Sequence, residues 1–206
     1  MQKLRRLFTG TEMGWMRVIL FAVASAVVTA FFLILPVFKG TSFEYMGVYP
    51  ESWLLFALLI IMNCKKPLEA GTKTFVFFLI SQPLIYLLQV PFAALGWQLF
   101  QYYPRWFIIT LLCFPGGIIA WYVKKDNFLS SVILAVACAL SGALLGSFLK
   151  SWMHPFPRLL LTVLLCAFLS FVIPPVLLKK KSNCILPWAV AALCAVGGFL
   201  RLIPGF

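Results

Sequence analysis

The sequence predicts an all-α fold: a polytopic transmembrane helical bundle with about seven spans, forming a single integral membrane domain over residues 1–206. Hydrophobic residues make up 63% of the chain and charged residues 11%, whereas about a quarter of the residues in soluble domains are charged. The apolar residues form long runs separated by short basic turns. A helix of about 20 apolar residues crosses a bilayer core of ~30 Å. These observations exclude a soluble protein.

A repeated pairing of an aromatic residue with proline divides the chain. Pro50, Pro104 and Pro157 each follow an aromatic residue, and they lie 54 and 53 residues apart. Each pair opens an apolar run that ends in a cluster of lysines. The chain is therefore expected to contain one leading helix followed by three tandem helical hairpins.

Seven spans are expected in chain order. The first is long enough to cross outright, so it is interpreted as a retained anchor; a signal peptide has an apolar core of only about 7–15 residues. The second is short and must tilt or extend back into the preceding loop. The third is the most polar and the fifth contains no proline. The expected spans are residues 15–38, 52–63, 75–100, 106–123, 128–149, 159–178 and 185–203.

The basic residues predict the orientation of these spans. With the N-terminus inside, twelve Lys and Arg residues fall on the cytoplasmic side and five on the other, as the positive-inside rule requires. The protein is expected to be multi-pass in a cell membrane, the inner membrane of a bacterial-type cell, with its N-terminus cytoplasmic and its C-terminus outside. The net charge of +12 is explained by these turns, so the lipid bilayer is the expected partner and nucleic acid is not.

Two stripes of small residues predict close helix contacts. One repeats every four residues along the first span, and the other lies on the fifth; they are Ala22, Ala26, Ala30 and Gly142, Gly146. Small residues at this spacing let helix backbones approach in membranes. A membrane-protein partner is expected to dock on these faces. The alanine stripe resembles the first helix of the substrate-capture subunits of energy-coupling-factor vitamin transporters; the likeness covers one helix, so no site is transferred from it.

The chemistry-bearing residues do not predict an enzyme. All five acidic residues, Glu51 among them, are assigned to termini or turns, which argues against carboxylate proton relays inside the membrane. The six cysteines lack metal-ligand spacing, and no metal or cofactor is expected. A Ser147 or Ser151 pair with His154 is formally possible, but an interfacial serine and a loop histidine are the favoured interpretation.

The candidate site lies in the third and fourth spans, which prolines interrupt. A proline frees the carbonyl four residues earlier, and broken helices near the midplane line substrate sites in transporters. The sequence favours a protein that binds or transports a small neutral or amphipathic molecule between these spans. The alternative is a non-transporting accessory, assembly or immunity protein. The expected ligand-binding residues are Gln82, Pro83, Gln89, Pro115, Gly116 and Gly117.

Overall fold

The computed structural model describes residues 6, 8, 10, 12–152 and 158–200, and this part of the chain is helical without strands. The elements are α2 (Trp15–Ile34), η1 (Pro36–Phe38), α3 (Ser42–Val48), α4 (Pro50–Met62), α5 (Pro67–Gln89), η2 (Gly96–Tyr102), α6 (Tyr103–Trp121), η3 (Tyr122–Lys125), α7 (Phe128–Trp152), α8 (Leu160–Ala167), η4 (Phe168–Val172), α9 (Ile173–Leu177), η5 (Lys181–Cys184) and α10 (Ile185–Phe199).

The predicted all-α class is confirmed. Six helical segments of the described chain are long and apolar enough to cross a membrane. The helices α3 and α4 are separated by a short break, at which the chain bends by 64°. If the two count as one span, they add a seventh crossing. Pro50 explains the break, since it has no N–H to continue the ladder from α3 and is well suited to start a new helix.

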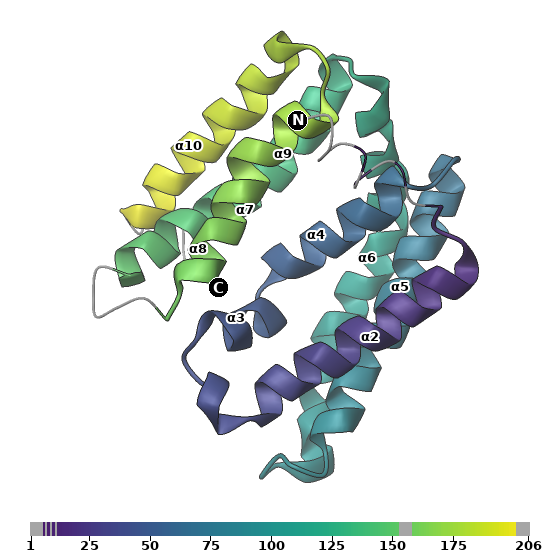
Figure 1. Cartoon of the computed structure of the whole chain (residues 1–206), viewed down its shortest axis with the longest axis vertical. Helices are drawn as coiled ribbons and strands as arrows, with labels where there is room; N and C mark the ends of the chain where they lie inside the picture. The colour runs from purple at the N-terminus through teal and green to yellow at the C-terminus, as the bar shows by residue number, and fades with distance from the viewer. Residues whose placement is uncertain (1–5, 7, 9, 11, 153–157, 201–206) are drawn as a thin grey trace.

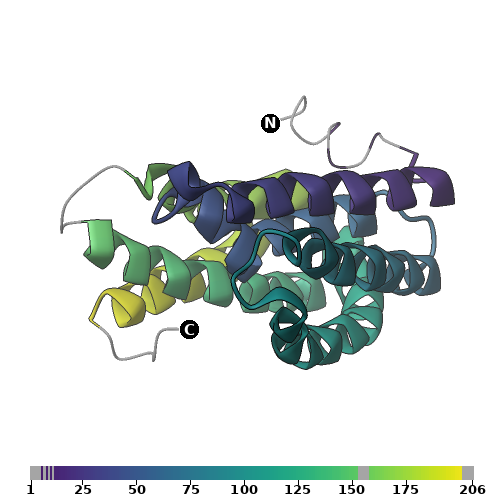
Figure 2. The ribbon, with the colours of Figure 1, turned by 90° about the horizontal axis from the view of Figure 1, so that it is seen from below.

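The helices form two groups with α4 between them (Figure 1). The N-terminal group contains α2, α5 and α6, and the C-terminal group contains α7, α8, α9 and α10. Figure 2 shows the same division from below. α6 packs mainly on α5, and α7 packs mainly on α10. The main packing units are therefore not the three successive hairpins that the proline spacing suggested.

Glycine and alanine hold the C-terminal group together. A Cβ added to Gly142 would lie 2.5 Å from the Ala191 carbonyl oxygen, and one added to Gly146 would collide with the Ala195 carbonyl oxygen. From the other helix, a Cβ on Gly198 would collide with the backbone of α7. The close contact predicted for the fifth span is present, and its partner in this chain is α10.

The N-terminal group uses small residues in the same way. Ala22, Ala26 and Ala30 are buried, in a helix that packs mainly on α5. Where α5 crosses α6, a Cβ on Gly71 would lie 2.6 Å from the Phe114 carbonyl oxygen, and one on Gly117 would lie 3.0 Å from the Ala70 carbonyl oxygen. Both predicted stripes are thus covered by the chain's own helices, and docking of a separate membrane protein there stays a prediction.

Two expected boundaries are wrong. The third span begins at Pro67, eight residues earlier than expected, because proline fits the first helical position and Glu69 accepts hydrogen bonds from the backbone N–H groups before it. It ends at Gln89, just before Pro91.

The third and fourth spans are also not interrupted as expected, since Pro83 and Pro115 lie inside the continuous helices α5 and α6.

The lysine-rich turns meet at one end of the molecule, which we call the lysine end. It contains residues 63–66, 122–127 and 178–184. Asp126 joins two of these turns: its carboxylate accepts hydrogen bonds from the backbone N–H groups of Lys179 and Lys180 and from the Asn183 amide. Its backbone has φ 50°, a left-handed conformation that Asp tolerates better than most residues. At the opposite end, the Ser42 N–H and hydroxyl donate to the Arg158 carbonyl.

Gly146→Ala is expected to destabilise the protein by about 1–3 kcal/mol, because the added methyl forces α7 and α10 apart. The matched control is Gly116→Ala on α6, where an added Cβ meets no atom within 4 Å. That change should hold or raise stability, by up to about 1 kcal/mol, through helix propensity. Thermal unfolding in detergent measures both. Equal melting temperatures for the two variants would contradict the packing of α7 on α10.

Candidate functional site

The two glutamines of the predicted site lie on α5 but have different surroundings. Gln82 is 3% exposed, and its amide nitrogen has no hydrogen-bond partner in the described chain. Gln89 donates to the Ile85 carbonyl oxygen at 3.0 Å and borders a cavity of about 290 Å³ near Lys39. The structure therefore does not bring the two amides together in one cavity.

The predicted Pro-Gly-Gly segment of α6 is divided between two faces. Pro115 and Gly116 are exposed on the outer surface. Gly117 is buried at the crossing with α5, where it permits close packing. Pro83 is half-buried within α5. None of these residues lines the large apolar crevice described next.

An apolar crevice of about 570 Å³ lies between α4 and α6, with contributions from α5 and α7. Trp106, Ile109 and Cys113 form the α6 side, and Ile109 is 46% exposed, so this side reaches the outer surface. The α4 side repeats at positions three and four apart, which lie on one face of a helix. The lining residues are Val48, Tyr49, Pro50, Trp53, Leu54, Ala57, Phe78, Trp106, Ile109, Cys113 and Leu140.

The position of the crevice differs from the expected one. A pocket was expected between the third and fourth spans, but those spans, α5 and α6, pack closely through Gly71 and Gly117. The break between α3 and α4 provides the space. Because α4 starts at Pro50 and is short, it leaves room between the two helix groups. Few polar groups border the crevice, so it suits an apolar body such as a hydrocarbon chain.

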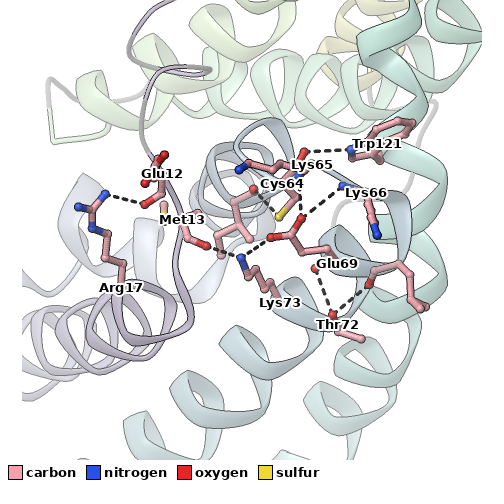
Figure 3. Close-up of polar contacts among 12 residues, drawn as sticks. Glu12, Met13, Arg17, Cys64, Lys65, Lys66, Glu69, Thr72, Lys73 and Trp121 are labelled. Atoms are coloured by element: carbon pink, nitrogen blue, oxygen red, sulfur yellow. Dashed lines mark hydrogen bonds and ion pairs between the residues drawn. The ribbon is translucent and has the colours of Figure 1, made fainter.

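A polar cluster occupies the lysine end (Figure 3). It borders a second cavity of about 590 Å³. Lys73 is nearly buried and donates to the Met13 carbonyl oxygen, while its ammonium lies 2.5 Å from the Glu69 carboxylate. The ammonium also lies 5.6 Å from the centre of the Trp15 ring. Lys73 was expected in a turn, but the early start of α5 places it inside the helix, where it ties α5 to the start of α2.

The Cys64 carbonyl oxygen is the second centre of this cluster. It accepts hydrogen bonds from the Trp121 indole at 3.0 Å and the Lys124 ammonium at 2.5 Å. The Cys64 thiol is buried; burial and, secondarily, the negative Glu69 raise the pKa of that thiol to about 11. The thiol is therefore protonated and unreactive at neutral pH. The contacts of this cluster connect the segment before α2 with α5, and the turn after α4 with the ends of α5 and α6.

Glu51 corrects one sequence-based expectation. It was assigned to a turn, but it lies in the first turn of α4 and is fully buried, 0% exposed. Neither carboxylate oxygen accepts a hydrogen bond within the described chain. One signal pointed to this: the second span was too short unless it extended back toward Pro50, and that extension includes Glu51. His154 lies outside the described residues.

No protein-family model matches the chain, and no significant match was found among curated proteins or solved structures.

Lys73→Met is expected to lower stability by about 1–3 kcal/mol, because it leaves the Met13 carbonyl and the Glu69 carboxylate without their common donor. The control is Lys181→Met, at an exposed position of the same end, which should change stability by less than about 0.5 kcal/mol. Both are measured by thermal unfolding in detergent. Equal stability of the two variants would show that the polar cluster does not hold the lysine end together.

Proposed function

We propose that this chain is a multi-pass membrane protein with seven spans, the bent pair α3 and α4 forming the second. The lysine end is placed in the cytoplasm, because basic residues concentrate in cytoplasmic turns. Lys39, Arg105 and Arg158 lie toward the opposite side. The exposed apolar residues of α2, α6, α7 and α10 are then covered by lipid, which removes the cost of leaving them in water.

Its proposed activity is to bind an apolar or amphipathic molecule, with a hydrocarbon portion, in the crevice between α4 and α6. The observation that carries this proposal is the crevice itself: about 570 Å³, almost entirely apolar, and reaching the outer surface beside Ile109. A membrane-dissolved molecule enters such a site from the bilayer without passing through water. If the protein also transports this molecule, α4 moves and releases it on one side of the membrane or the other.

The accessory or assembly role is the less supported alternative. It was based on small-residue faces available for a partner, and both faces are covered within the chain by α5 and α10. A partner would need another surface.

Occupancy of the crevice by lipid is tested by fluorescence of a variant that keeps only Trp53, with the other tryptophans changed to phenylalanine. Trp53 is 3% exposed but lines the crevice, so surrounding lipids do not reach it. Phospholipids with brominated chains are expected to quench its fluorescence, because a chain enters the crevice and contacts the ring.

Two controls complete this test. A variant keeping only Trp188, which is 36% exposed on α10, should be quenched by ordinary surface contact. Cys113→Phe fills the crevice from α6 and should remove most of the Trp53 quenching while leaving that of Trp188 unchanged. Trp53 fluorescence that brominated lipid does not alter, in protein shown to be folded, would contradict the proposed binding.

The orientation is tested by labelling single cysteines in a cysteine-free background with a membrane-impermeant maleimide. Lys39→Cys and Ser182→Cys lie at exposed positions toward opposite ends of the molecule. Intact cells are expected to label Lys39→Cys, whereas Ser182→Cys should react only after the membrane is permeabilised. Reaction of both positions in intact cells would show that no membrane separates the two ends.

A further inference from the structure

A carboxyl group lies deep inside the bundle, on the helix that separates the two helix groups. Glu51 is eleven residues before Met62, the last residue of α4 at the lysine end, and a helix rises 1.5 Å per residue, so the two are about 16 Å apart. A bilayer core is ~30 Å thick. In the proposed membrane arrangement, on which this inference rests, Glu51 lies near the middle of the membrane.

The carboxyl has no charged partner. The described chain contains one ion pair, Lys73 with Glu69, and neither Glu51 oxygen accepts a hydrogen bond there. The titratable groups that interact electrostatically with Glu51 are Tyr49, at the start of its own helix, and Cys166, on α8. Both are neutral when protonated. The surroundings therefore provide no charged group to balance a negative charge, and only the backbone N–H groups in the first turn of α4 favour one.

Two further polar atoms without partners lie on α8 and on α4. Thr162 and Cys166 are four residues apart on α8 and fully buried, so they share one face of the helix. The Thr162 hydroxyl has no hydrogen-bond partner in the described chain, and neither has the hydroxyl of Ser52, next to Glu51. The Thr162 N–H donates to the hydroxyl of Ser42, which in turn bonds to Arg158 at the end opposite the lysine end.

The physical chemistry restricts the state of Glu51. An ionised carboxylate in an apolar interior without a partner is strongly disfavoured, and ionisable residues kept inside membranes mark ion or proton sites. Metal ions need several ligands, and the described residues contain no group of three His, Cys, Asp or Glu side chains that would hold one. A proton needs only the carboxyl.

We propose that Glu51 is a proton-binding site inside the membrane: it holds a proton while α4 packs against α8, and it releases the proton when that contact opens. Pro50, Trp53 and Ala57, which line the crevice, lie on the adjoining face of the same helix. A movement of α4 that changes the surroundings of Glu51 therefore also changes the shape of the crevice. This links proton binding to ligand binding through one short helix.

The test is infrared difference spectroscopy of the full-length protein in lipid vesicles, titrated from mildly acidic to alkaline pH. The carbonyl band of a protonated carboxyl is separate from that of a carboxylate, so no reagent has to reach the buried site. The wild type is expected to show a protonated carboxyl at neutral pH that is lost on alkaline titration. Glu51→Gln should abolish this band completely, and Glu51→Asp should shift it. Glu44→Gln, outside the site, should leave it unchanged.

Three results would overturn the proposal: no protonated carboxyl that depends on Glu51 at neutral pH, a band that never titrates while the protein stays folded, or a carboxylate that appears only when sodium is present. The last would identify a cation site instead. Circular dichroism shows whether each variant folds, and Glu51→Asp preserves the test if the glutamine variant does not. Trp53 quenching in the same vesicles reports the crevice separately, so failure at Glu51 is distinguishable from failure of the proposed lipid binding.

Discussion

Close contact between helix backbones is the interaction on which the rest of this structure depends. Lipid tails are as apolar as the helix surfaces, so the hydrophobic effect does not drive membrane helices together. Close packing has to hold them in contact. Gly142, Gly146 and Gly198 allow this for α7 and α10, and Gly71 and Gly117 allow it for α5 and α6. These contacts produce two compact groups. The shorter helices α3 and α4 fill the space between them, and the crevice and the buried carboxyl are both found there.

The interior has two kinds of polar group, and they differ in how well they are satisfied. At the lysine end, Lys73, Lys124 and Trp121 all bond to backbone or carboxylate oxygens, as expected of groups that hold a structure in place. The Glu51 carboxylate and the hydroxyls of Ser52 and Thr162 have no partner in the described chain, and the same holds for polar atoms of three α5 side chains, Gln82 among them. Such atoms are costly in a folded protein unless a ligand, a proton or water uses them, which is why the first region is interpreted as structural and the second as functional.

The sequence was sufficient for the helical class and the small-residue contacts, because each depends on local composition with a fixed period, whereas the orientation indicated by the basic turns stays a prediction. It was insufficient where tertiary packing decides the outcome. Pro115 and Gly116 looked like a break at a site, yet the ladder of α6 continues past them and they face outward. Glu51 was predicted to lie in a turn. Its burial depends on α8, which follows more than a hundred residues later in the chain, so no local pattern indicated it. The pairing of α7 with α10 was equally invisible, since no repeat in the sequence encodes it.

The fixation of α4 at one end has a mechanical consequence. At the lysine end, the Asn63 amide bonds to the carbonyls of Phe8 and Leu59, and the neighbouring Cys64 carbonyl holds Trp121 and Lys124. At the other end, α4 begins at the bend after Tyr49, where the chain changes direction by 64°. A rod clamped at one end and jointed at the other behaves as a lever. Any tilt about the Asn63 pivot is smallest among the lysines and greatest at Pro50 and Glu51, about 20 Å along the arm. Pro50, which lines the crevice, and the buried Glu51 would therefore move together, and by a larger distance than the rest of α4.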